Sequence, residues 1–500
     1  MFEGLLTGLH TAFSIENVLF LMTGCFAGTF IGMLPGLGPM TAIALMIPIA
    51  STLDPSSGII MMAAVYYGAI FGGSTSSILI NAPGVASTVA TSFDGHPMAR
   101  EGKAGKALAI AAFASFSGGI IGALLLLAFA PYLATVSLSF QSTDYFALIV
   151  LGLVCVAAFA GSTGMLKALA MTVFGLMLST VGSDQTQGLP RFTLGQIDLI
   201  DGISFLLLVM ATFALSEVVL AILKGPASHG EGTPALSSIR IKSAEAIDAA
   251  PTIARSSTLG FFIGLLPGAG ATIASFLAYG TEQRLAPKEA RQKFGKGSIR
   301  GLAAPESANN AAATGSFVPL LTLGIPGSGT TAILLGALIA YGIQPGPLLY
   351  INHPEVFWGV IVSMWLGNAI LLILNLPLIP YIARLLAIPR GFLLPLIIFF
   401  SLIGVYFVSF NTFDIQLMVV FAMVAVFFRL LDFPMAPMIL GFVLGSMIEE
   451  NLRRALLIYD GNFSFLWERP LTAAIMLIAT IVLIAPLISK ANTMRRENKA

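Results

Sequence analysis

The sequence predicts an all-α polytopic membrane protein with about 12 transmembrane helices. Hydrophobic residues make up 57% of the 500 residues, charged residues only 10%, and the mean hydropathy is +0.92. A water-soluble domain needs a more polar surface than this composition supplies. Apolar runs long enough to cross a bilayer as helices occur at 107–130, 357–379 and 471–488. They lack the alternating pattern of an outer-membrane barrel, so we expect a helical fold in a lipid bilayer.

The placement of Lys and Arg predicts which connections face the cytoplasm, because cytoplasmic loops carry an excess of these residues. The densest group lies at 284–300, which is either an amphipathic surface helix or a solvated loop. Polar connections without Lys or Arg are assigned to the outside: 51–58, 131–143 and 345–355. Four arginines remain in outside loops that also carry acidic residues: Arg191, Arg453, Arg454 and Arg469. The net charge of +1 gives no indication of a nucleic-acid partner.

The same assignment predicts a re-entrant hairpin in the second half of the chain. The polar segments 224–255 and 281–300 both come out cytoplasmic, although the apolar stretch 256–280 lies between them. A single helix cannot begin and end on one side of a membrane. We therefore expect a hairpin whose tip is formed by Pro267, Gly268 and Gly270.

Three pairs of similar segments indicate an internal repeat. "IGMLPGLGPMTAIA" (31–44) matches "IGLLPGAGATIASF" (263–276), and "NAPGVASTVA" (81–90) matches "GIPGSGTTAI" (324–333). Further on, "APYLA" (130–134) matches "IPYIA" (379–383), in the same order along the chain. The first match predicts a second hairpin tip, formed by Pro35, Gly36 and Gly38.

The charges predict that the two copies have inverted topology. The apolar run 107–130 follows basic residues, whereas its counterpart 357–379 precedes them. Inverted repeats are frequent in secondary transporters, which bind substrate near the bilayer midplane at broken helices. The predicted organisation is a first transmembrane repeat at 1–223, a cytoplasmic linker at 224–255, a second transmembrane repeat at 256–490 and a cytoplasmic tail at 491–500.

The second pair of Pro-Gly segments is predicted to bind an anionic substrate. A Pro-Gly break frees the first amides of the next half-helix and directs its positive dipole end at the gap. No Lys or Arg stands inside these segments, so we expect the anion to be held by dipoles and neutral donors. The candidate substrate-binding residues are Ser74, Thr75, Ser76, Asn81, Pro83, Gly84, Ser87, Asn309, Asn310, Pro326, Gly327, Ser328, Thr330 and Thr331.

Each of these features also has a structural explanation. Pro-Gly in a transmembrane helix is often a tolerated kink, small-residue runs permit close helix packing, and paired asparagines can join helices. Glu306 is the candidate for coupling to Na⁺ or H⁺, because ionisable residues inside a membrane are usually functional. It directly follows Pro305, so the alternative is an interfacial residue in a first helical turn. The occurrence of four Pro-Gly breaks at matched positions favours the functional interpretation.

Three long blocks resemble the large membrane subunit of the tripartite tricarboxylate transporter family. They are "IGMLPGLGPMTAIALMIPIA" (31–50), "YYGAIFGGSTSSILINAPGVASTVATSFDGHPMAREGKAGKAL" (66–108) and "APESANNAAATGSFVPLLTLGIPGSGTTAILLGALIAYGIQPGP" (304–347). The resemblance implies a bacterial inner-membrane permease that imports tricarboxylates or related carboxylates by ion-coupled transport. It also implies two partners, a small four-helix membrane subunit and a periplasmic solute-binding protein.

Two other function classes are compatible with a polytopic membrane protein: an intramembrane enzyme, and a passive channel or structural component. An intramembrane enzyme would need a constellation such as HExxH, GxSxG or paired carboxylates, and the sequence contains none. We therefore expect no catalytic residues, no metal site and no cofactor beyond the coupling ion. The remaining alternative is a passive anion channel or a structural membrane component, which would not need matched re-entrant breaks.

Overall fold

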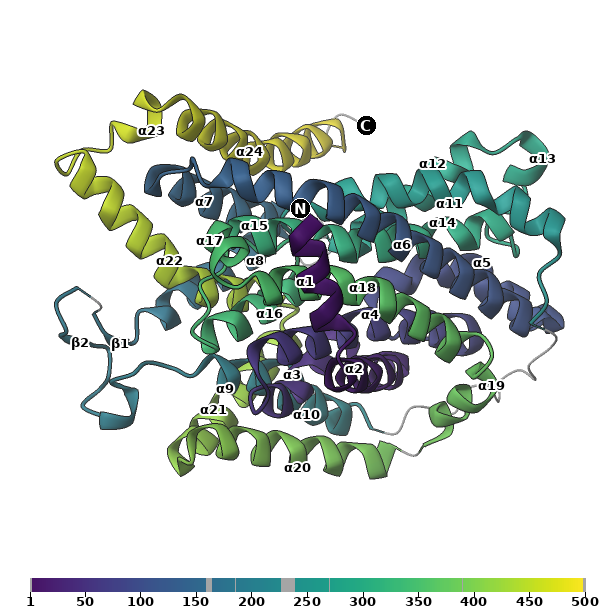
Figure 1. Cartoon of the computed structure of the whole chain (residues 1–500), viewed down its shortest axis with the longest axis horizontal. Coiled ribbons are helices and arrows are strands. Elements are labelled where there is room, and N and C mark those ends of the chain that lie inside the picture. The colour runs from purple at the N-terminus through teal and green to yellow at the C-terminus, as the bar shows by residue number, and fades with distance from the viewer. Residues whose placement is uncertain are drawn as a thin grey trace.

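The computed structural model describes residues 2–158, 164–184, 186–225, 239–268, 270–388 and 390–497. They form a helical protein (Figure 1), in which the strands β1 (Gly182–Ser183) and β2 (Pro190–Arg191) form one small antiparallel hairpin. Seven helical segments of these residues are long and apolar enough to cross a membrane: Ile15–Met33, Pro55–Ile80, Ala86–Ser137, Phe205–Leu223, Pro354–Asn375, Gly391–Ser409 and Thr412–Leu430. The prediction of an all-α polytopic membrane protein is confirmed, while the count of about 12 crossings stays a prediction.

The described helices of the first half include four short pieces that are not regular α-helix. These are 3₁₀ turns at Ala86–Thr88 and Ile197–Leu199 and wider π-helical turns at Ala99–Lys103 and Met210–Leu215. The α-helices are α1 (Phe2–Ala12), α2 (Ile15–Met33), α3 (Gly38–Ala50), α4 (Pro55–Ile80), α5 (Val89–Met98), α6 (Ala104–Ser137), α7 (Ser142–Ala158), α8 (Met165–Ser179), α9 (Phe205–Val209) and α10 (Ser216–Leu223).

The second half begins with a helix that starts inside the segment expected to be a linker. Its elements are α11 (Ser243–Gly264), α12 (Gly270–Leu285), α13 (Lys288–Arg291), α14 (Ile299–Gly315), α15 (Phe317–Leu323), α16 (Gly329–Ala340), α17 (Pro347–Asn352), α18 (Pro354–Asn375), α19 (Ile379–Ile382), a 3₁₀ turn (Ala383–Ala387), α20 (Arg390–Ser409), α21 (Thr412–Leu430), α22 (Ala436–Ile458), α23 (Phe465–Glu468) and α24 (Pro470–Glu497).

Two of the predicted boundaries differ from these elements. Helix α11 begins 13 residues before position 256, because its polar first turns continue the apolar helix beyond the predicted span. Helix α24 runs past position 490 to Glu497. Parts of the predicted linker (226–238) and tail (498–500) lie outside the described residues. Between the end of α12 at Leu285 and the start of α14 at Ile299, the basic stretch 284–300 contains only the four-residue helix α13, which agrees with the loop interpretation.

Left-handed caps create both of the broken segments. Helix α4 starts with a Pro after the N-cap Asp54 and ends at Asn81, whose φ is 51°. Helix α15 ends at Gly324 with a φ of 68°. Asn and Gly are the residues that most readily adopt this conformation at a helix end. The sequence therefore stops each helix just before its Pro-Gly pair.

Glycines allow the hairpin helices to pack closely on two buried helices, α4 and α14. A Cβ added to any of four glycines would collide with backbone atoms of the facing helix. The two glycine contacts of the first half have counterparts in the second half. The residues of each contact and of its counterpart are separated by the same numbers of residues as the duplicated sequence motifs. The four pairs are Gly28 on Val65, Gly32 on Ala69, Gly260 on Ala308 and Gly264 on Ala312.

Seven of the ion pairs form two groups at opposite ends of the molecule. In Figure 1 the β1–β2 hairpin and α23 lie at the left, and α12, α13 and α19 lie at the right. The pairs Lys106–Glu245, Arg255–Glu282 and Arg300–Asp248 join segments assigned to the cytoplasm. The four arginines of the segments predicted to lie outside meet acids of the same segments: Arg191–Glu449, Arg453–Asp184, Arg454–Glu450 and Arg469–Asp144. Which group of segments faces the cytoplasm stays a prediction.

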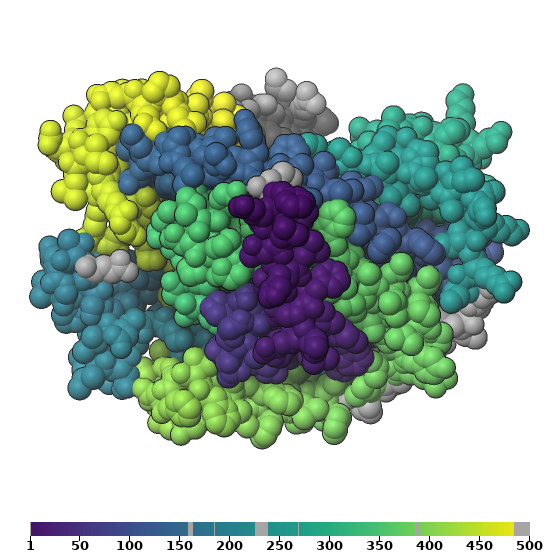
Figure 2. Space-filling view, viewed as in Figure 1, coloured from purple at the N-terminus to yellow at the C-terminus, as the bar shows by residue number. Residues whose placement is uncertain are grey.

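The remaining helices surround this core to different depths. Figure 2 shows α1 lying across the middle of one face, where Gly4 and Gly8 pack on Trp358 of α18. Helices α20 and α21 expose many large apolar side chains, among them Phe399, Phe400 and Phe427. Such apolar surface is expected on helices that face lipid.

Candidate functional site

The two hairpin tips and the two broken segments line one cavity of about 900 Å³. One tip lies between α2 and α3 and the other between α11 and α12. The π-helical turn Met210–Leu215 and helices α4, α10, α21 and α22 complete the wall. The predicted residues that line the cavity are Gly36, Gly38, Pro83, Gly84, Ser87, Gly268, Gly270, Ser328 and Thr330.

The backbone at the tips requires glycine. Gly36 and Gly38 have φ values of 94° and 66°, and Gly268 and Gly270 have values of 80° and 57°. Side chains are strained at such angles, so only glycine adopts them freely. The Gly268 N–H donates a hydrogen bond to the Gly327 carbonyl oxygen at 3.0 Å, which ties the second tip to its broken segment.

Other predicted substrate-binding residues already form hydrogen bonds or caps within the protein. Ser76 Oγ accepts a hydrogen bond from the Gly84 N–H at 3.1 Å. Thr331 pairs with Ser328 as a capping box at the start of α16. Asn81 is exposed and caps α4. These and the rest of the candidates are not among the residues that line the cavity: Pro35, Ser74, Thr75, Ser76, Asn81, Pro267, Asn309, Asn310, Pro326, Gly327 and Thr331.

Ser87 and Thr330 are the cavity hydroxyls best placed to contact a ligand. The Ser87 hydroxyl is buried and has no hydrogen-bond partner among the described residues. Thr330 is 6% exposed and lies in the first turn of α16, so the positive end of that helix dipole points at the cavity. The two residues occupy equivalent positions in the repeated motifs. An anion between them would meet hydroxyl donors from both halves.

A cation also stands in the wall, contrary to the expectation of neutral donors alone. Arg429 of α21 forms an ion pair with Glu217 of α10, and both residues line the cavity. The Arg429 guanidinium also donates to the Thr212 carbonyl oxygen at 2.9 Å and lies 5.8 Å from the centre of the Phe213 ring. The sequence places Arg429 near the cytoplasmic end of an apolar run, and only the tertiary packing brings it to the cavity.

The π-helical turn Met210–Leu215 explains how Arg429 is held. Wide turns of this kind shift carbonyl groups out of the regular helical ladder and are frequent at functional sites. Here the Thr212 carbonyl accepts from Arg429, and the Phe213 carbonyl accepts from the Thr41 hydroxyl at 2.9 Å. The turn therefore connects α21 with the first hairpin.

Glu306 is fully buried at the eighth position of α14, so it is not an interfacial residue in a first turn. Ser74 of α4 donates a hydrogen bond to its carboxyl at 2.8 Å, and Ser115 of α6 at 2.7 Å. Thr91 of α5 donates to the other carboxyl oxygen. The carboxyl thus joins four helices at a place separate from the cavity lining. Neither Thr91 nor Ser115 stands in a motif that would have revealed this contact.

The paired asparagines belong to the Glu306 helix and not to the cavity. Asn310 Nδ2 donates to the Glu306 carbonyl oxygen at 3.0 Å and to Asn309 Oδ1 at 2.7 Å. Asn309 Nδ2 is buried and has no partner among the described residues. These hydrogen bonds stay within α14, so among the described residues the two asparagines do not join two helices.

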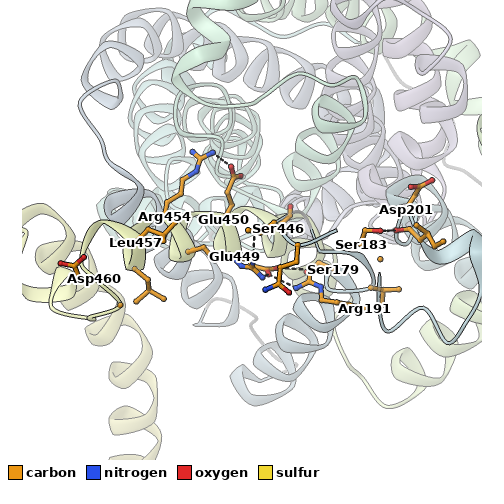
Figure 3. Close-up of a pocket in the computed structure, with 18 residues that line it drawn as sticks. Ser179, Ser183, Arg191, Asp201, Ser446, Glu449, Glu450, Arg454, Leu457 and Asp460 are labelled. Carbon is orange, nitrogen blue, oxygen red and sulfur yellow. Dashed lines mark hydrogen bonds and ion pairs between the residues drawn. The ribbon is translucent and has the colours of Figure 1, made fainter. Parts of the chain in front are cut away.

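A second hollow, of about 1310 Å³, lies beside the β1–β2 hairpin and α22 (Figure 3). Its walls are highly charged, with Arg191 bound to Glu449 and Arg453 bound to Asp184. The hydrogen bond from Arg453 holds the pKa of Asp184 well below its usual range, and the bond from Arg191 lowers the pKa of Glu449. Because its three arginines, Arg191, Arg453 and Arg454, are already paired with carboxylates, this hollow is a weaker candidate for an anion site.

Comparison with known proteins gives the family. The chain matches the Tripartite tricarboxylate transporter TctA family over residues 18–440. An Agrobacterium vitis protein, "Uncharacterized 52.8 kDa protein in TAR-I ttuC' 3'region", is 41% identical over 495 residues, which are 99% of this chain and 98% of that protein. A second, "Uncharacterized protein in TAR-II ttuC' 3'region", is 42% identical over 236 residues, which are 47% of this chain and 97% of that protein.

No solved structure matches the chain. The matched family is that of a transporter membrane subunit, not of an enzyme. The match extends over more than four-fifths of the chain and includes the hairpin tips, both broken segments and Arg429. The chain therefore belongs to the TctA family, the large membrane subunit of tripartite tricarboxylate transporters.

Proposed function

We propose that the protein is the permease of a binding-protein-dependent secondary transporter that imports tricarboxylates or related carboxylates. The observation that carries this proposal is the cavity where two hairpin tips, two broken segments and Arg429 meet. Helix N-termini, free hydroxyls and a guanidinium are the groups that bind carboxylates. Family membership supports the partners, a small four-helix membrane subunit and a periplasmic solute-binding protein, and a location in the bacterial inner membrane.

The proposed mechanism is alternating access by two inverted repeats. The matched glycine contacts support the repeat, because Gly32 on Ala69 and Gly264 on Ala312 keep the sequence spacing of the duplicated motifs. The two hairpins and the two broken segments then move together around the substrate. We favour an elevator motion, since hairpin tips that meet at a site suit it.

Glu306 is the proposed coupling group, for Na⁺ or H⁺. Its carboxyl is fully buried and bound by hydroxyls, with no Lys or Arg among its partners in the described part of the chain. A buried carboxylate without a positive partner is costly. Uptake of a cation or proton removes that cost and draws α4, α5, α6 and α14 together. The coupling site and the substrate cavity are therefore distinct. The first broken segment connects them, because it lines the cavity and lies in the chain between Ser74 and Thr91, which bind Glu306.

The test is uptake of labelled citrate, and of a panel of di- and monocarboxylates, into proteoliposomes that hold the chain with both partners. An imposed Na⁺ or H⁺ gradient should drive accumulation. Ser87→Ala and Thr330→Val should depress uptake, while the control Thr322→Val, which removes a buried hydroxyl bonded within α15, should not. Glu306→Gln should leave downhill exchange intact and abolish the gradient dependence. Uptake by the parent protein that ignores both gradients would favour the passive anion channel.

A further inference from the structure

The ion pair between Arg429 and Glu217 lies in the wall of the cavity. One of the three guanidinium nitrogens of Arg429 has no hydrogen-bond partner among the described residues. One terminal nitrogen of Arg429 donates to Glu217 and the other to the Thr212 carbonyl oxygen. The third group, Nε, is buried and has no hydrogen-bond partner among the described residues. Buried polar groups are almost always paired, so an unpaired donor beside a cavity indicates a place for a ligand.

The chemistry of the pair resembles that of the proposed substrate. Glu217 presents to Arg429 the same carboxylate group that a di- or tricarboxylate presents, and guanidinium binds carboxylates through parallel hydrogen bonds. The Glu217 side chain is 20% exposed and the Arg429 side chain 18%. A partly exposed Glu217 can turn into water when it loses its partner. Arg429 is held more firmly, by Thr212 and by the face of Phe213.

An empty cavity explains why Glu217 is needed. A partly buried guanidinium without a counter-charge is unfavourable, because removing one member of a buried pair leaves an uncompensated charge. Glu217 supplies that charge while no substrate is bound. When a substrate carboxylate arrives, it brings its own negative charge, and the wall then holds two carboxylates for one cation.

We propose that Glu217 and a carboxylate group of the substrate compete for Arg429, so that Arg429 binds the substrate and Glu217 sets its affinity. This inference rests on the proposed function and names the residue that recognises the carboxylate. Competition lowers the affinity for substrate and eases its release from the cavity. The two members of one ion pair then have opposite effects on binding, which a purely structural pair cannot have.

The experiment measures citrate binding to the purified full-length chain in lipid nanodiscs by titration calorimetry. Removal of the competitor in Glu217→Gln should tighten citrate binding about tenfold, since a charge-assisted hydrogen bond contributes roughly the free energy of a tenfold change. Arg429→Gln should weaken binding about tenfold or more. The double variant should bind citrate like Arg429→Gln, because without the guanidinium there is no group for which Glu217 and the substrate carboxylate can compete. The control Asp248→Asn breaks the Arg300–Asp248 pair, which does not line the cavity, and should leave binding unchanged.

A charge-conserving variant separates loss of the guanidinium from loss of the positive charge. Arg429→Lys keeps the positive charge beside Glu217 and loses the planar guanidinium, so it should fold and still bind citrate more weakly than the parent. Tighter binding in Glu217→Gln cannot arise from damage to the fold. If both single variants weaken binding equally, or if neither changes it, the pair is structural and the inference is wrong. If the parent chain binds neither citrate nor any other carboxylate of the panel, the proposed function itself fails.

Discussion

Gly264→Ala tests whether close packing of α11 on α14 sets the geometry of the cavity. A Cβ at this position would overlap the Ala312 carbonyl oxygen and lie 2.8 Å from Ala312 Cα, whereas ordinary van der Waals contact begins at 3.4 Å. The contact with Cα alone would require the helices to separate by about 0.6 Å, and the closer oxygen requires more. Overpacking of this kind costs typically about 1–3 kcal/mol, against a helix-propensity gain of about 1 kcal/mol for Gly→Ala. The net loss is then up to about 2 kcal/mol, and the overlap with backbone atoms favours the upper end of that range.

The displacement should also reduce transport, because Gly264 lies at the base of the second hairpin. The Gly264 carbonyl oxygen is 2.9 Å from the place where a Cβ on Gly327 would stand, so the hairpin and the broken segment are packed tightly there. The assays are the unfolding midpoint of the solubilised protein and the initial rate of citrate uptake. The matched control is Gly280→Ala on α12, where an added Cβ meets nothing within 4 Å. Equal midpoints and equal rates for the two variants would refute the packing argument.

Three further tests address the buried carboxyl, the helix cap and the charged hollow. Glu306→Ala should cost about 3 kcal/mol, because it leaves three buried hydroxyls without their acceptor, while Glu306→Gln should cost much less; chemical unfolding compares the two. Asn81→Gly should preserve citrate uptake, since glycine also adopts the left-handed cap that ends α4; a clear loss of uptake would restore Asn81 as a ligand. The pKa of Asp184 is lowered by Arg453, so its stabilisation is complete above about pH 4 and is lost as the pH falls through the folded-state value. The stability gap between the parent and Arg453→Gln should therefore narrow below about pH 4, as unfolding midpoints measured from pH 6 to 3 would show.

Composition and motif spacing predict the membrane class and the position of the turns, and the resemblance of three long blocks to a known family predicts the family. Hydrophobic length identifies spans because a bilayer has a fixed thickness, and Pro-Gly pairs mark breaks because they cannot continue a helix. The tips at Gly36 and Gly268 and the caps at Asn81 and Gly324 follow from local backbone preferences. Helix boundaries were less predictable, as at α11, because polar turns can extend an apolar helix into water.

The contacts of Glu306 and Arg429 were beyond the reach of local patterns. Glu306 receives hydroxyls from residues 74, 91 and 115, which lie on three different helices and stand in no common motif. From the sequence, Arg429 is one of the basic residues that the positive-inside rule assigns to the cytoplasm. Its place beside the cavity depends on how α21 packs against the π-helical turn, which is a property of the tertiary structure.

Several candidate ligands do not line the cavity, for a physical reason that applies to membrane proteins in general. Inside a bilayer, every backbone group released by a broken helix must find a partner, so nearby polar side chains are first used to satisfy the backbone. Ser76 pairs with the Gly84 amide in this way, and Thr331 with Ser328. Richness in hydroxyls therefore marks where a helix breaks, but it does not identify what binds. The groups left for a substrate are those that the fold has not already paired, which is why Ser87 and the Nε of Arg429 rank above the more conspicuous clusters.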